Sequence, residues 1–176
     1  MKYKDAIKNS MNYLAKDEKV IFLGYNTKMG NQALGTLTDI PKEKIIETPL
    51  AENLMTGLAI GLSLSGYKPV LYFERFDFIL NGIDAIINHL DKIKDLSKHQ
   101  FRPKVIIRVV IGQKLKPFFN GSTHSQDFTD SMKKLVNFPI LKPVTANEVI
   151  DAYKFAFQYE ESVMIVEHKD YYDIDY

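Results

Sequence analysis

The chain has 176 residues, of which 45% are hydrophobic and 26% charged, values that suit one globular domain and exclude a disordered chain. Lys and Arg number 23 against 22 for Asp and Glu, so the net charge of +1 gives no reason to expect nucleic acid or a membrane as the main partner. Cysteine is absent, which excludes disulfides and thiolate sites. With no signal-peptide core and no apolar run near the ~20 residues of a membrane helix, we expect a soluble cytoplasmic domain.

In the first part of the chain, the apolar pattern alternates between helices and short strands. Helical spacing over residues 6–14 predicts a first helix, and the apolar run that follows predicts a buried strand ended by Gly24. A loop with room for a short helix leads to a second strand at Ile45, and a second helical pattern then covers about 51–65. There, Gly57 and Gly61 lie four residues apart, a spacing that predicts a close packing contact with the helix.

The remaining pattern continues this alternation. It predicts strands at 70–73, 105–111, 140–141 and 163–166, a long amphipathic helix over 81–94 and a loop over 112–129. Thr145 and Glu148 form a capping box that opens a last helix. Five or six strands alternating with helices predict an α/β fold in three layers, with an open, mostly parallel sheet flanked by helices.

Ligands of such sheets lie beyond the carboxyl ends of the strands, where three turns carry reactive or aromatic residues. The turn after the second strand places Glu52 in the first turn of a helix, where a carboxylate also suits the helix dipole. The next turn carries Phe76 and Phe78, which core packing explains as well as ligand stacking does. The third loop carries His124, and a histidine in a loop is more often solvated than catalytic. Each signal is weak alone, whereas their order and spacing are specific.

Taken together, these motifs resemble the pyrimidine-binding domain of the thiamine diphosphate enzymes, the transketolase superfamily. Within it, the likeness is greatest to the beta subunit of two-subunit 2-oxoacid dehydrogenases of the pyruvate type. The resemblance runs from about Lys4 to His168. The residues that carry it are Glu47-Thr48-Pro49-Leu50-Ala51-Glu52, Gly57, Gly61, Gly66-Tyr67-Lys68-Pro69-Val70, Phe76-Asp77-Phe78-Ile79, Asp84-Ala85-Ile86-Ile87-Asn88 and His124-Ser125-Gln126. It implies a thiamine diphosphate-binding fold, with residues 1–170 as the pyrimidine-binding domain and 171–176 as a C-terminal tail.

The resemblance also implies roles for the candidate residues around the cofactor. Glu52 matches the carboxyl group that hydrogen-bonds N1′ of the aminopyrimidine and favours its imino tautomer, so that the cofactor itself removes the C2 proton. Phe78 matches the ring that stacks on the aminopyrimidine, and Phe76 would be a neighbouring wall.

His124 matches the active-site histidine of the family, which handles protons or binds the substrate carboxylate. Ser125 and Gln126 belong to the same substrate-side segment and would orient the histidine. No residue of the chain is expected to ligate a metal.

The Gly-Asp-Gly…Asn motif that anchors diphosphate and Mg²⁺ in this superfamily is missing from the sequence. The resemblance therefore implies a separate alpha-type, diphosphate-binding subunit, with self-association or a heterotetramer in which residues 52–65 and 76–88 lie at an interface. The chain ends at Tyr176, where beta subunits of the family continue into a second domain, and the loop at 113–120 is bulkier and more basic than their glycine-rich stretch.

The leading interpretation is one subunit of an enzyme that cleaves or forms a C–C bond next to a carbonyl, acting on a small 2-oxo acid or sugar. One alternative is a split transketolase that transfers a two-carbon ketol unit, which a phosphate-binding cluster of Lys114, Lys116 and Arg108 would favour. Another is a non-catalytic structural or regulatory subunit that keeps the fold, against which the presence of Glu52 and His124 speaks. A flavodoxin-like binding module is weaker still, because no phosphate loop follows the first strand.

Overall fold

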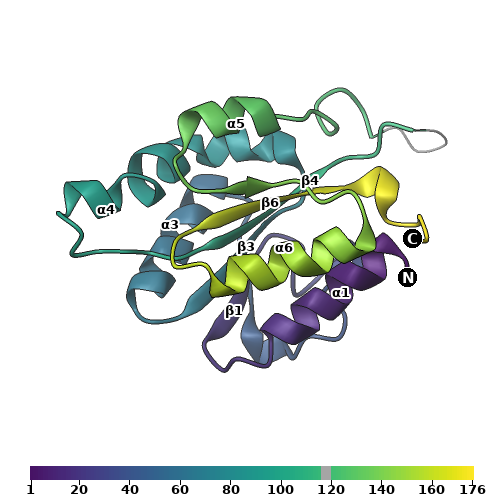
Figure 1. Cartoon of the computed structure of the whole chain (residues 1–176), viewed down its shortest axis with the longest axis horizontal. Coiled ribbons are helices and arrows are strands. Elements are labelled where there is room, and N and C mark those ends of the chain that lie inside the picture. The colour runs from purple at the N-terminus through teal and green to yellow at the C-terminus, as the bar shows by residue number, and fades with distance from the viewer. Residues whose placement is uncertain (116–119) are drawn as a thin grey trace.

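The computed structural model describes residues 1–115 and 120–176, in which one six-stranded sheet lies between two layers of helices (Figure 1). The strand order is β2-β1-β3-β4-β6-β5, and every neighbouring pair is parallel. The strands are β1 (Val20–Gly24), β2 (Ile45–Glu47), β3 (Lys68–Phe73), β4 (Ile106–Ile111), β5 (Ile140–Leu141) and β6 (Val163–His168). This arrangement confirms the predicted α/β fold with an open parallel sheet.

The α-helices are α1 (Tyr3–Leu14), α2 (Gln32–Gly35), α3 (Glu52–Leu64), α4 (Ile93–Leu96), α5 (Thr129–Leu135) and α6 (Ala146–Gln158). Shorter helical turns are η1 (Lys42–Lys44), η2 (Phe76–Gly82), η3 (Ala85–Leu90) and η4 (Lys169–Tyr171). The Thr145 capping box at the start of α6 is present as predicted. No helix in the described part of the chain is long and apolar enough to cross a membrane.

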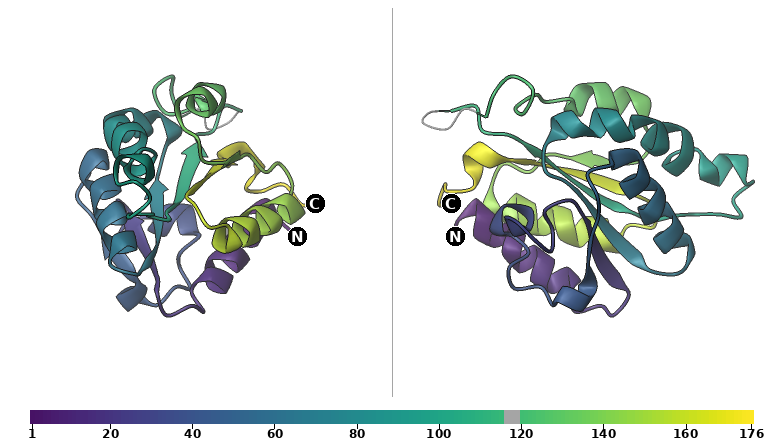
Figure 2. Two further views of the ribbon diagram at one scale, coloured as in Figure 1. Left: turned by 60° about the vertical axis from the view of Figure 1, so that its left-hand side comes forward. Right: turned by 180° about the vertical axis from the view of Figure 1, so that it is seen from behind.

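The sheet separates two apolar cores, and Figure 2 shows which helices cover each face. Helices α1 and α6 pack on one face, while α3, η2, η3 and α5 pack on the other. Every residue of β4 is buried, as expected for a central strand of a parallel sheet.

The segment predicted as one helix over 81–94 is instead broken into three pieces. A 3-10 stretch, η2, is followed by a π-helical turn, η3, and then by the short helix α4. The apolar positions Ile86 and Leu90 are buried as the periodicity indicates. The pattern thus identified the buried face but not the winding, because 3-10, α- and π-turns all bring residues three to five apart onto one side.

The packing contact expected for the glycines of α3 is absent within the described chain. No atom lies within 4 Å of a Cβ placed on Gly57 or Gly61, and both residues are exposed. On the same helix, the side chains of Leu54 and Leu58 are 57% and 37% exposed. Helix α3 therefore presents an apolar, small-residue face to solvent.

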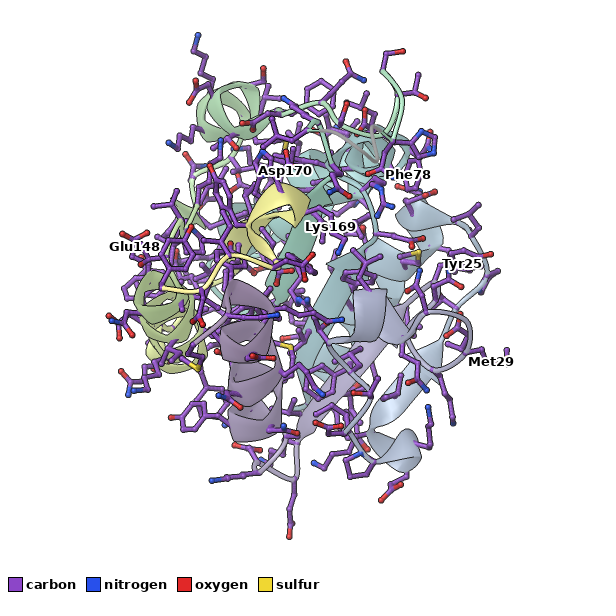
Figure 3. All side chains as sticks on the ribbon, turned by 90° about the vertical axis from the view of Figure 1, so that its right-hand side faces the viewer. Tyr25, Met29, Phe78, Glu148, Lys169 and Asp170 are labelled. Atoms are coloured by element: carbon purple, nitrogen blue, oxygen red, sulfur yellow. The ribbon has the colours of Figure 1, made fainter. Side chains whose placement is uncertain are left out.

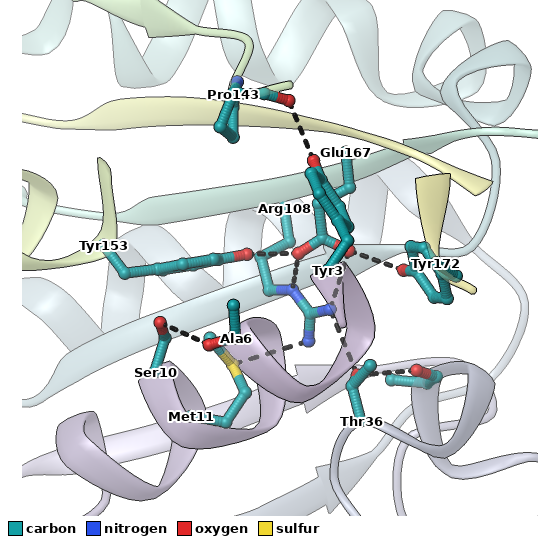
Figure 4. A network of polar contacts seen from close by, with 11 residues as sticks. Tyr3, Ala6, Ser10, Met11, Thr36, Arg108, Pro143, Tyr153, Glu167 and Tyr172 are labelled. Atoms are coloured by element: carbon teal, nitrogen blue, oxygen red, sulfur yellow. Dashed lines mark hydrogen bonds and ion pairs between the residues drawn. The ribbon is translucent and has the colours of Figure 1, made fainter. Parts of the chain in front are cut away.

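On the opposite side of the sheet, a buried ion pair joins the neighbouring strands β4 and β6 (Figure 4). Arg108 of β4 donates two hydrogen bonds to the carboxylate of Glu167 on β6, at 2.9 and 3.0 Å. The hydroxyl groups of Tyr153 and Tyr172 also donate to this carboxylate. Because each carboxylate oxygen is satisfied, the burial of both charges is compensated, and the network ties α6 and the C-terminal segment to the sheet.

Candidate functional site

Glu52 is the first residue of α3 and lies at the carboxyl edge of the sheet. The chain leaves β2, makes a short turn and enters the helix with no side-chain cap at Ala51. The Glu52 side chain is only 7% exposed although it carries a carboxyl group. Among the described residues, no hydrogen bond reaches that carboxyl group, and the hydroxyl of Thr56 donates to the backbone carbonyl of Glu52. The carboxyl oxygens are not fully buried, since the fully buried side-chain atoms without a partner belong to Thr48, Tyr72 and Arg75. The first turn of α3 thus holds a largely buried glutamate whose carboxyl group has free hydrogen-bonding capacity.

A small pocket opens beside this carboxyl group. Its lining residues are Tyr25, Leu50, Glu52, Met55, Tyr72, Phe73, Glu74 and Phe78. In Figure 3, which faces the carboxyl edge, Tyr25 and Phe78 lie on the same side of the molecule. The lining combines aromatic and apolar side chains with two carboxylates, and it contains no Lys or Arg.

The aromatic residues after β3 have different environments. Phe78 is half-buried in the pocket, and its ring meets the His124 ring edge to face, with centroids 5.3 Å apart. Phe76 is completely buried in the core, where its ring packs edge to face on that of Phe128, with the ring centroids 5.8 Å apart. The structure therefore brings Glu52, Phe78 and His124 to one region but places Phe76 behind the site.

The segment after His124 is fixed by backbone and side-chain hydrogen bonds. Ser125 is buried, and its hydroxyl donates to the carbonyl of Gly121 at 2.9 Å. Gln126 donates from Nε2 to Asp77 at 2.7 Å and from its backbone N–H to the same carboxylate at 3.3 Å. Neither of these side chains forms a hydrogen bond with the His124 ring. The Nδ1 atom of that ring lies 3.1 Å from the hydroxyl oxygen of Thr123.

Two glycines allow the backbone to approach the site residues closely. A Cβ on Gly82 would lie 3.0 Å from the carbonyl oxygen of Glu52. A Cβ on Gly112, directly after β4, would lie 1.8 Å from the carbonyl oxygen of His124. Any larger residue at either position would displace the backbone that carries Glu52 or His124.

The loop that carries Tyr25 is held by two carboxylates at the strand ends. Glu47 accepts hydrogen bonds from the backbone N–H groups of residues 26–29, at 2.7 to 3.2 Å. Burial acts to raise the pKa of Glu47, but these N–H groups outweigh it and hold the pKa below its usual value. Glu74 accepts hydrogen bonds from the side chains of Asn26 and Asn31. Tyr25 is thereby kept beside Glu52.

Two residues of this region were missed by the sequence analysis. Tyr25 lies in a segment with loop composition, so no periodicity marked it, although its position directly after β1 is itself a signal. Asp77 lies between the two phenylalanines and was read only as part of the motif. Its contact with Gln126 joins segments 49 residues apart, which no local pattern reveals.

The donor set suits part of a thiamine-type cofactor. A largely buried carboxyl group without an internal partner can bond a ring nitrogen, and an aromatic ring in the same pocket offers a stacking surface. The pocket offers no cation for a diphosphate, because its lining holds neither Lys nor Arg. The pocket lining thus holds the residue types that the pyrimidine end of such a cofactor requires, and it holds none that would bind the diphosphate.

Known proteins are similar to this chain over nearly its whole length. The family model "Transketolase, pyrimidine binding domain" matches residues 1–174. The mitochondrial pyruvate dehydrogenase E1 component subunit beta of Saccharomyces cerevisiae is 27% identical over 174 residues, which are 96% of this chain and 47% of the relative. The 2-oxoisovalerate dehydrogenase subunit beta of Bacillus subtilis is 27% identical over 98% of this chain and 53% of the relative.

A solved structure described as a split gene transketolase, inactive beta4 tetramer, shares the fold. It has a TM-score of 0.70 and 19% identity, and the match covers 99% of this chain and 51% of that chain. The present chain thus spans about half the length of the curated relatives and of this structural neighbour.

Proposed function

This chain belongs to the family of transketolase pyrimidine-binding domains, and from that premise we propose that it is the pyrimidine-binding subunit of a heteromeric thiamine diphosphate-dependent enzyme. The reaction proposed is the cleavage or formation of a C–C bond next to a carbonyl, with a 2-oxo acid as the substrate. The observation that carries the proposal is the largely buried, unpartnered carboxyl group of Glu52 in one pocket with Phe78.

Glu52 would act on the ring nitrogen N1′ of the aminopyrimidine. Its carboxyl group can share a proton with that nitrogen because no described residue hydrogen-bonds it. When bound, thiamine diphosphate supplies the nucleophilic carbon that adds to the substrate carbonyl. Phe78 would orient the aminopyrimidine by stacking, and Tyr25 would close the pocket from the side of β1.

His124 would act later, on the substrate side. Its ring is partly exposed and contacts Phe78, so it lies where a substrate bound next to the stacked ring would meet it. There it can transfer a proton or bind a substrate carboxylate. Ser125 and Gln126 would support this segment through their own hydrogen bonds rather than through the imidazole.

The substrate class follows the relatives rather than the pocket. The curated relatives named above are beta subunits of 2-oxoacid dehydrogenases, which favours a 2-oxo acid over a sugar. The likeness to the split transketolase shows the fold alone. Arg108, which would have supported sugar-phosphate binding, is fully buried and paired with Glu167, and Lys116 lies outside the described residues.

The partner proposed is an alpha-type subunit that binds diphosphate and Mg²⁺. The lining of the described pocket holds no cation for phosphate, which supports a site whose other half is supplied by an alpha-type subunit. The exposed apolar face of α3, next to Glu52, is the proposed contact surface of this assembly.

Reconstitution tests the proposal. The chain is mixed with a diphosphate-binding alpha-type subunit, thiamine diphosphate and Mg²⁺, and consumption of a branched or linear 2-oxo acid is compared with that of a ketose phosphate. We expect turnover of the 2-oxo acid, and a Phe78→Ala variant that loses about 1–3 kcal/mol of cofactor binding. Turnover of the ketose alone would identify a split transketolase, and cofactor binding without any turnover would favour a non-catalytic subunit.

A further inference from the structure

The candidate site is assembled from two segments that are distant in the chain. Phe78 follows β3, whereas His124 lies in the loop after β4. The Phe78–His124 ring contact is an edge-to-face contact between partly exposed side chains, and such contacts alone stabilise weakly. The buried ring of Phe76 packs against Phe128 and joins the same two segments by apolar contact. A hydrogen bond would add a fixed direction to this link.

Asp77 makes that connection. Its side chain is 7% exposed, and the partners of its carboxylate among the described residues are both on Gln126. One oxygen accepts from the Gln126 side chain at 2.7 Å and the other from the Gln126 backbone at 3.3 Å. A buried carboxylate that accepts two hydrogen bonds from one residue fixes both the position and the rotation of that residue.

Two neighbouring contacts also restrict the loop that carries His124. Gly112 lets the His124 carbonyl pack onto the end of β4, which limits movement of the loop toward the sheet. The hydroxyl of Ser125 bonds Gly121 and closes the loop on itself. Gly112 also lies beside the aliphatic part of Arg75 after β3, but that contact is not a hydrogen bond. Among the described residues, the hydrogen bonds that join the two segments are those between Asp77 and Gln126.

We infer that Asp77 is a positioning residue, which holds His124 against Phe78 by binding Gln126. Asp77 is not itself a pocket-lining residue, and its hydrogen bonds among the described residues go to Gln126 and not to the His124 ring, so its carboxylate would act through Gln126. The inference rests on the proposed function for its consequence in catalysis. The positioning itself can be measured without cofactor, partner or turnover.

Nuclear magnetic resonance of the 176-residue chain provides two readouts. The first is hydrogen exchange of the Gln126 amide, which donates directly to Asp77. The second is the chemical shift of the His124 ring protons, which the Phe78 ring displaces at a centroid distance of 5.3 Å. Spectra of Phe78→Ala give the shift without that ring.

Asp77→Ala is expected to accelerate exchange of the Gln126 amide by about tenfold, the loss of one hydrogen bond to a charged group, while amides of β4 keep their protection. The His124 signals should move toward those of Phe78→Ala. Asp77→Asn should retain most of the ring shift, because its remaining oxygen can still accept from the Gln126 side chain. Asp130→Ala is the matched control, since it removes a carboxylate that is 96% exposed in α5.

Wild-type exchange and wild-type His124 shifts in Asp77→Ala would overturn the inference, whatever the activity of the reconstituted enzyme. If Asp77→Ala does not fold, Gln126→Ala removes the other partner of the same link, and unchanged His124 shifts there would overturn the inference equally. In the reconstituted enzyme, Asp77→Ala should lower kcat with cofactor binding unchanged, and Asp77→Asn should restore it. Absence of turnover in the wild type would refute the proposed function and leave the exchange result standing.

Discussion

At the scale of single residues, the site depends on where the backbone can come close. Glu52 is buried without being paired, and it stays in place because Gly82 lets the segment after β3 pack against its carbonyl at van der Waals distance. The chemistry of the carboxyl group is thus tied to a residue with no side chain. A carboxyl group displaced by about 1 Å would be misaligned with a ring bound beside it.

Gly82→Ala should therefore destabilise the isolated chain by about 1–3 kcal/mol, since the added methyl group must push the Glu52 backbone aside. The matched control is Gly57→Ala, whose Cβ would enter open space and should stabilise α3 by about 0.5–1 kcal/mol. Urea unfolding of both variants measures the difference. Equal stability of the two variants would contradict the close approach at Gly82.

At the scale of elements, the strands and helix α3 were predictable from the sequence. The type of helical turn in the segment after β3 was not. Apolar runs identify parallel strands because both faces of each strand are buried. The residues after Phe73 form 3-10 and π-turns whose apolar spacing imitates an α-helix. For the site, family likeness gave Glu52, Phe78 and His124, but the contacts that hold them join distant segments.

Glu47 illustrates such a contact between elements, because one carboxylate at the end of β2 orders the loop after β1. Its pKa is lowered in the folded chain, so its stabilisation is complete above the unfolded-state pKa and is lost as the pH falls through the lower, folded-state pKa. Glu47→Gln should cost about 1–2 kcal/mol at neutral pH and flatten the acid dependence of unfolding. Unfolding curves across the acid range check this expectation.

The control for Glu47→Gln is Glu43→Gln, which neutralises an exposed carboxylate of η1 only a few residues away. It should leave both stability and its pH dependence unchanged within about 0.5 kcal/mol. If both variants behaved alike, general charge rather than the loop contact would explain the effect of Glu47.

At the scale of the whole molecule, the chain has well-packed cores but exposes an apolar surface on α3. Its two cores and its buried ion pair are complete, yet Leu54 and Leu58 of α3 remain exposed beside glycines that nothing covers. The pocket supplies a carboxyl group and aromatic rings but no phosphate ligand. Both features support the proposal that another subunit completes the site.

Leu54→Asp should therefore leave the fold and thermal stability of the isolated chain unchanged and should weaken its association with itself or with an alpha-type subunit by at least about tenfold. Leu96→Asp is the control, because Leu96 is 77% exposed at the end of α4, away from α3. Sedimentation velocity of both variants, alone and with the alpha-type subunit, measures this association. Equal association of the two variants would place the interface elsewhere.

The central claim is that Glu52 drives activation of the cofactor, and hydrogen–deuterium exchange at C2 of bound thiamine diphosphate tests it most directly. Glu52→Gln keeps the shape of the side chain but replaces the shared acid proton with an amide. In the reconstituted complex we predict that this variant slows C2 exchange by at least ~10²-fold, while cofactor binding weakens much less because the diphosphate is held by the partner subunit. His124→Ala should leave the exchange rate unchanged and reduce only turnover. A wild-type exchange rate in Glu52→Gln would contradict the claim and remove Glu52 from the mechanism.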